Sequence, residues 1–134
     1  MQYSLAASQA SLAIERLRGS DFAKLNPGRV VEMKFLKGSE QSYLGPNSGR
    51  DAVLFNTYWF VDEAVKLTVF DLFEGVMMRL GGRPHWGKLH KRQDIEYLRS
   101  VYPEWDKFET VRARFDPDQI FDPPTRQSNV EPVS

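Results

Sequence analysis

Apolar residues recur every three or four positions in four stretches of the chain, the spacing of one face of an α-helix. The strongest pattern, at 62–80, combines a broad apolar stripe with acidic residues in its first turn, where the helix dipole favours them. Weaker patterns of the same kind lie at 8–18, 94–101 and 104–115. We therefore expect four helices, the longest in the middle of the chain.

Two other stretches have the patterns of β-strands. Residues 29–36 alternate with a period of two, which places Glu32 and Lys34 side by side on one face and apolar residues on the other. Residues 52–61 are apolar on both faces, as expected of a central strand covered on two sides. The polar residues 37–51 between them predict a long loop, and loops of this length are often functional.

The stretch GGRPHWGKLH at 81–90 follows the longest predicted helix and is unusually dense in distinctive residues. Its two glycines predict a helix end in the left-handed region, and the residue before a proline favours extended backbone. If 83–88 is extended, Trp86 and Lys88 face one site together while His85 faces the other way. The simpler interpretation is that Trp86 anchors the core and Lys88 is a solvated edge charge.

These elements predict an α+β domain with a few mostly antiparallel strands and helices packed on the sheet. Residues 1–4 would be a short extended lead. A turn after the last helix should bring Ile120 and Phe121 back to the core. We expect the domain to cover 1–121 and the proline-containing residues 122–134 to form a disordered tail.

Composition excludes several classes of function. The chain of 134 residues has 18 basic and 18 acidic residues, so no overall positive field favours nucleic acid binding. It has no cysteine, which excludes disulfides, cysteine-bound zinc and a thiolate nucleophile. No apolar run approaches the roughly 20 residues of a transmembrane helix. We expect a soluble protein, cytoplasmic by default, with membrane association left open.

Few residues remain that could carry chemistry. The two histidines, His85 and His90, have no carboxylate at ligand spacing, so a metal site is not expected, and glycine-rich phosphate-binding motifs are absent. The remaining candidates are Glu32, Lys34, His85, Trp86 and Lys88. A carboxylate and an ammonium two residues apart can also form the solvated face of a half-covered sheet. The cluster would need an external cofactor to carry out redox chemistry.

The order of four motifs resembles the C-terminal part of the sugar-1,4-lactone oxidases, the family of L-gulonolactone oxidase, D-arabinono-1,4-lactone oxidase and alditol oxidase. The motifs are VVEMKF at 30–35, GRDAV at 49–53, GGRPHWGKLH at 81–90 and YPEWDKFETVRARFDP at 102–117. Their combination at these separations is more specific than any one of them. The resemblance covers most of residues 29–121.

The resemblance implies a flavoprotein of the vanillyl-alcohol-oxidase type. FAD would lie mainly in an N-terminal domain, while this part covers the isoalloxazine ring and completes the substrate site. Lys88 would lie near the flavin N1/C2 carbonyl region, where a cation stabilises the reduced flavin. Glu32 would act on substrate hydroxyls or orient a neighbour. Lys34 stands where the family usually carries arginine, so the positive charge remains but the planar guanidinium, which can bind an oxygen-bearing group through two N–H donors, is lost.

The resemblance further implies that Asn56 and Tyr58 contact substrate, and that His85 and Trp86 shape the flavin site. The expected partners are an FAD-binding domain or chain and a sugar lactone or polyol. Nothing in these 134 residues resembles the family's FAD-binding domain, so we expect no activity from the chain alone. Two interpretations stay open: the substrate-binding and flavin-capping part of an oxidoreductase, or a non-catalytic structural or interaction module.

Overall fold

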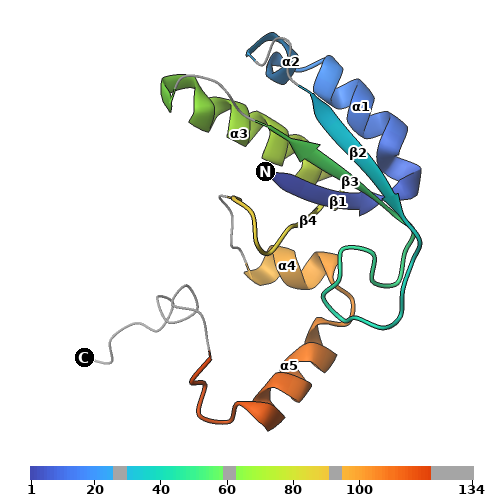
Figure 1. The fold of residues 1–134 in the computed structure, drawn as a ribbon, viewed down its shortest axis with the longest axis vertical. Coiled ribbons are helices and arrows are strands. Elements are labelled where there is room, and N and C mark those ends of the chain that lie inside the picture. Colours follow the sequence, from blue (N-terminus) through green and yellow to red (C-terminus); the bar gives the residue numbers. More distant parts are fainter. Residues whose placement is uncertain (26–29, 59–62, 91–94, 122–134) are drawn as a thin grey trace.

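The computed structural model describes residues 1–25, 30–58, 63–90 and 95–121. The strands are β1 Gln2–Ala6, β2 Val31–Leu36, β3 Ala52–Thr57 and β4 Arg83–Pro84. The helices are the 3-10 helix η1 Ala7–Gln9, then α1 Ala10–Arg18, α2 Asp21–Leu25, α3 Glu63–Arg79, α4 Ile95–Val101 and α5 Trp105–Phe115. The strands form one antiparallel sheet in the order β2-β3-β1-β4 (Figure 1). The predicted α+β class is confirmed.

Side chains of the sheet alternate between an apolar face and a polar face. On the apolar face, Met33, Phe55 and Tyr3 stand in one row across β2, β3 and β1. Helices α1, α2 and α3 cover this face with the buried residues Ala13, Leu17, Phe22, Val69, Phe70, Phe73, Val76 and Met77. Burying these side chains is the main favourable contribution to folding, and it decides which residues of each strand point to the opposite face.

The four predicted helices are confirmed as α1, α3, α4 and α5, although residues 62 and 94 lie outside the described ranges. Helix α3 ends where the glycine pair predicted, because Gly81 has a φ of 68°, in the left-handed region. The two predicted strands are confirmed as β2 and β3, while 59–61 lie outside the described residues. The short helix α2 was not predicted.

The N-terminal segment, expected to be a short extended lead, is an inner strand of the sheet. It is β1, and it pairs antiparallel with β3 on one side and with β4 on the other. Tyr3 and Leu5, its odd positions, are buried in the core together with Met1, which precedes the strand. Residues near the start of the chain therefore lie at the centre of the molecule.

A second, smaller core connects the sheet to α4 and α5. It consists of the buried Leu98, Tyr102 and Trp105, and the indole of Trp86 stacks on the Tyr102 ring at 5.5 Å between centroids. Figure 1 shows α4 next to β4, with α5 extending away from the sheet. The long loop at 37–51 packs against this region, because Leu44 belongs to the same cluster.

The prediction that Ile120 and Phe121 return to the core is wrong, since they are 73% and 84% exposed. A turn does follow α5, but the Asp116 carboxylate holds it by accepting hydrogen bonds from the backbone N–H groups of both residues. The predicted tail, 122–134, lies outside the described residues. Among the helices that the structure describes, none is long and apolar enough to cross a membrane.

Candidate functional site

A row of polar side chains crosses the sheet on the face opposite the core. Glu32 on β2 pairs in register with Asn56 on β3, and Asn56 pairs with Gln2 on β1. Residues directly opposite one another on neighbouring strands point to the same face, so three strands contribute one side chain each. The row lies on the predicted polar face of residues 29–36, which confirms that Glu32 and Lys34 share a face.

Hydrogen bonds join this row to Lys88. The Asn56 amide nitrogen donates to Glu32 Oε2 at 3.2 Å, and the Asn56 amide oxygen accepts from Lys88 Nζ at 3.1 Å. Lys88 Nζ also donates to Gln2 Oε1 at 2.7 Å. Asn56 is only 5% exposed and uses both ends of its amide. A continuous polar network therefore runs from a carboxylate on β2 to an ammonium that follows β4.

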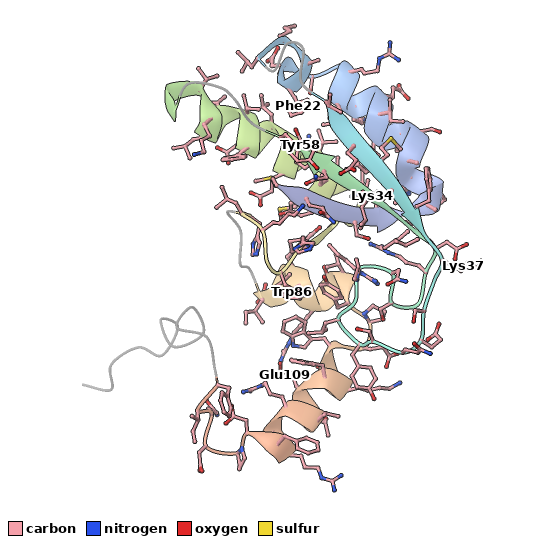
Figure 2. The ribbon with its side chains drawn as sticks, viewed as in Figure 1. Phe22, Lys34, Lys37, Tyr58, Trp86 and Glu109 are labelled. Atoms are coloured by element: carbon pink, nitrogen blue, oxygen red, sulfur yellow. The ribbon has the colours of Figure 1, made fainter. Side chains whose placement is uncertain are left out.

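Glu32 is held as a carboxylate by its neighbours. Lys34 Nζ lies 3.0 Å from Oε1, and the Tyr58 hydroxyl donates to Oε2 at 3.1 Å. The Lys34 hydrogen bond, followed by that of Asn56 and more weakly Tyr58, lowers the pKa of Glu32 below its usual 4.5. Lys34 and Tyr58 lie on the same side of the sheet (Figure 2). At neutral pH Glu32 is therefore a hydrogen-bond acceptor rather than an acid.

Lys88 reaches the network through a turn and not through an extended strand. The Lys88 backbone N–H donates to the His85 carbonyl at 3.0 Å, and the Gly87 N–H donates to His85 Nδ1 at 3.1 Å. Only Arg83–Pro84 of the predicted extended segment is a strand. The turn breaks the alternation of side chains on which the sequence-based prediction depended.

Trp86 and Lys88 have different hydrogen-bond partners, so the extended geometry from which the sequence predicted that both approach one site is not formed at 85–88. The Trp86 indole N–H donates to the Leu44 carbonyl at 3.0 Å, and its ring stacks on Tyr102. The indole is 47% exposed, so it joins the second core at its edge (Figure 2). This geometry agrees with the simpler interpretation of Trp86 as an anchor, while His85 stays exposed in the turn.

The charged groups of the site are accessible, whereas the amides beneath them are not. Side-chain exposure is 60% for Lys34 and 33% for Glu32, and Lys88 is exposed as well. Gln2 and Asn56 are buried. Fixed amides thus hold two ammoniums and one carboxylate at the surface, an arrangement suited to a ligand with hydroxyl groups and an electron-rich edge. In the described parts of the chain no cluster of His, Asp or Glu could hold a metal.

Sequence reasoning missed Gln2. The signal that could have found it is the alternation in MQYSLA, where apolar Met1, Tyr3 and Leu5 flank polar Gln2 and Ser4. That pattern is typical of a half-covered strand, but the run is short and stands at the beginning of the sequence.

Comparison with known proteins gives consistent matches. The sequence model of the D-arabinono-1,4-lactone oxidase family matches residues 1–128. L-gulono-1,4-lactone dehydrogenase of Mycobacterium tuberculosis is 36% identical over 91 residues, which are 68% of this chain and 21% of that protein. L-gulonolactone oxidase of Scyliorhinus torazame is 30% identical over 128 residues, covering 89% of this chain and 28% of that protein.

Alditol oxidase of a Streptomyces species is 30% identical over 109 residues, covering 81% of this chain and 25% of that protein. The chain therefore spans between 21% and 28% of the length of these curated relatives.

Proposed function

This chain belongs to the D-arabinono-1,4-lactone oxidase family, and we propose that it forms the substrate-binding and flavin-capping part of an FAD-dependent oxidoreductase. The substrate would be an aldono-1,4-lactone or a polyol, oxidised at a CH–OH group. The relatives are named as enzymes of gulonolactone and alditol. The observation that carries the proposal is the network in which Asn56 joins the Glu32 carboxylate to the Lys88 ammonium on the face of the sheet opposite the main core.

The chemistry of Lys88 fits the role of a flavin contact. FAD, when bound, would accept the hydride from the substrate carbon. Lys88 offers an exposed ammonium that two amide oxygens orient from below. A preorganised cation of this kind stabilises negative charge at the N1/C2 edge of a reduced flavin at no cost in reorganisation. His85 and Trp86, the first two residues of the turn, would shape and support the flavin site by holding this turn in place, since Trp86 is anchored on Leu44 and Tyr102.

Glu32 has capacity left for a substrate hydroxyl. Among the described residues, its Oε2 accepts from Asn56 and Tyr58, while Oε1 contacts only Lys34. A carboxylate offers about four acceptor positions, so Oε1 retains one. Because Glu32 is ionised, we expect it to accept a hydrogen bond from the substrate and to orient the hydroxyl that is oxidised. Tyr58, which is half exposed, would contact the same substrate.

Lys34 would supply a second cation to the substrate side. Its side chain is 60% exposed and pairs with Glu32 at 3.0 Å. A lysine presents one compact donor group where an arginine presents a planar fork, so it holds an oxygen atom by charge and not by bidentate geometry. We expect weaker orientation of substrate at this position than an arginine would give.

Reduction kinetics of the flavin-containing protein test the proposal. Lys88→Met should slow anaerobic flavin reduction by a lactone or polyol by about 10²–10³-fold, the cost typical of losing one preorganised electrostatic contact. Lys24→Met is the matched control, because Lys24 is exposed on α2, which covers the other face of the sheet. It should leave the rate within about twofold. Equal rates in both variants would refute the role of Lys88 as a flavin contact, on which the proposal depends, and would make Lys88 a solvated surface charge.

A further inference from the structure

The ammonium of Lys88 is held by two neutral acceptors. Gln2 Oε1 lies 2.7 Å and Asn56 Oδ1 3.1 Å from Lys88 Nζ. Both acceptors belong to inner strands and are buried, with 9% and 5% exposure. A lysine side chain has four rotatable bonds, so fixing its end requires partners that are themselves fixed. Strands β1 and β3 provide such partners.

Neutral acceptors orient a cation without cancelling its charge. Within the described residues, no carboxylate forms an ion pair with Lys88, and Glu32 is separated from it by the Asn56 amide. Glu32 pairs directly with Lys34 instead. The network therefore contains two ammoniums and one carboxylate, and the excess positive charge lies at Lys88. A carboxylate in place of the Gln2 amide would neutralise this charge.

Gln2 also fixes the start of the turn that carries Lys88. The backbone N–H of His85 donates to the Gln2 carbonyl at 3.1 Å, while the Gln2 side chain accepts from Lys88. One residue of β1 thus holds the first and the last residue of the turn at 85–88. Asn56 contacts the ammonium but makes no described contact with the beginning of the turn.

We propose that Gln2 is a positioning residue, which acts through Lys88: it fixes the turn at 85–88 and directs an un-neutralised ammonium toward an electron-rich ligand edge. The identity of that edge as flavin rests on the proposed function. The hydrogen bond to Lys88 does not, and it can be tested in the chain itself.

Acylation of Lys88 by a water-soluble N-hydroxysuccinimide ester, followed by peptide mass spectrometry, reports the hydrogen bond. The reagent attacks the lone pair of the amine, so Nζ must first leave its hydrogen bond to Gln2 Oε1. Gln2→Met removes the acceptor and should accelerate acylation of Lys88 about 3- to 10-fold. Gln2→Glu adds a charged acceptor and should slow it by a similar factor. The opposite signs distinguish loss of the bond from a general loosening of structure.

Two controls keep the test decisive. Gln41→Glu makes the same change of charge at an exposed loop position and should leave Lys88 acylation unchanged. Exposed Lys24 on α2 serves as an internal reference in every sample. If Gln2→Met is poorly folded, Gln2→Asn keeps the amide but withdraws the acceptor by one methylene, and it should also accelerate acylation. Rates within twofold of wild type in all Gln2 variants would overturn the proposal.

The flavin midpoint potential of the flavin-containing protein separates this proposal from the proposed function. Lys88→Met should lower the potential, Gln2→Glu should lower it partway, and Gln41→Glu should leave it unchanged. If Lys88→Met leaves the midpoint potential unchanged, Lys88 does not contact the flavin, but the acylation result can still support the role of Gln2 in positioning Lys88. If Lys88→Met lowers the midpoint potential but the Gln2 variants leave the acylation rate of Lys88 unchanged, the flavin role of Lys88 is supported and the positioning role of Gln2 is overturned.

Discussion

Arg83 connects the sheet to the second core, and its removal should weaken the fold measurably. The side chain is 3% exposed. Its Nε donates to the Val101 carbonyl at 2.6 Å, and a terminal nitrogen donates to the Ser48 carbonyl at 2.7 Å and to the Gly45 carbonyl at 3.3 Å. The guanidinium also lies 4.9 Å from the centre of the Tyr102 ring. One side chain thereby joins β4, the loop at 37–51 and the end of α4.

The expected cost of Arg83→Met follows from these contacts. Methionine is unbranched and adapts to irregular spaces, so packing losses are small. The two short hydrogen bonds from a charged donor are worth about 1.5–3 kcal/mol each. Relief of burial offsets part of this, because desolvation, with the nearby Arg50 charge, lowers the pKa of Arg83 to about 10. We expect the free energy of unfolding to fall by about 2–4 kcal/mol.

Urea denaturation followed by tryptophan fluorescence measures this change, since Trp86 and Trp105 both contact the Tyr102 ring next to Arg83. Arg99→Met, at an exposed position on α4, is the control and should change the free energy of unfolding by no more than about 0.5 kcal/mol. Arg83→Lys should fall between them, because one ammonium cannot replace the fork. A loss below about 1 kcal/mol for Arg83→Met would refute the reasoning.

Two further predictions concern the polar face, and a third concerns FAD binding. The Lys34 contact lowers the pKa of Glu32, so the ionised Glu32 stabilises the fold above pH 4.5, and this stabilisation is lost as the pH falls through the lower, folded-state pKa. The free energy of unfolding, measured from about pH 6 to 3, should therefore depend less on pH in Glu32→Gln than in the wild type. An unchanged pH dependence would contradict this prediction. Lys34→Ala should cost less than about 1 kcal/mol of stability, because the Lys34–Glu32 pair is largely exposed. The same variant should reduce kcat/KM of the flavin-containing enzyme about 30-fold or more, whereas Lys34→Arg should keep or raise kcat/KM. If kcat/KM stays within twofold of wild type in both variants, Lys34 is a surface charge. The chain without an FAD-binding partner should not bind FAD at low micromolar concentration, since it has no dinucleotide-binding motif, and stoichiometric binding in equilibrium dialysis would disprove this.

The spacing of apolar residues along the chain predicted those helices and strands whose structure depends mainly on residues close to one another in sequence. The apolar stripe of α3 and the alternation of β2 are set within a few turns or residues, so both elements and the Glu32–Lys34 pair could be predicted. The left-handed end of α3 at Gly81 is local for the same reason. For these elements, intrinsic preference and tertiary structure agree.

Contacts between distant residues decided the parts that sequence reasoning missed. The turn at 85–88 forms because β1 and the second core hold its residues, with the His85 N–H bonded to Gln2 and the Trp86 indole bonded to Leu44. The alternation rule for extended chains cannot foresee such contacts. The helix α2 and the role of Gln2 also depend on tertiary structure, because a five-residue helix and a five-residue strand carry little periodic signal.

The position of Lys88 depends on the core as much as on its polar partners. A Cβ on Gly82 would lie 2.6 Å from the Met77 carbonyl oxygen and 3.1 Å from the Tyr3 ring, so only glycine allows the end of α3 to approach β1 this closely. That approach brings β4 into register with β1, and the turn after β4 then delivers Lys88 to Gln2. The apolar residues at odd positions of β1, meanwhile, fix the register that aligns Gln2 with Asn56, and a slip of β1 by one residue would turn the Gln2 amide into the core. The residues that stabilise the fold are therefore the same ones that determine where the site's cation lies.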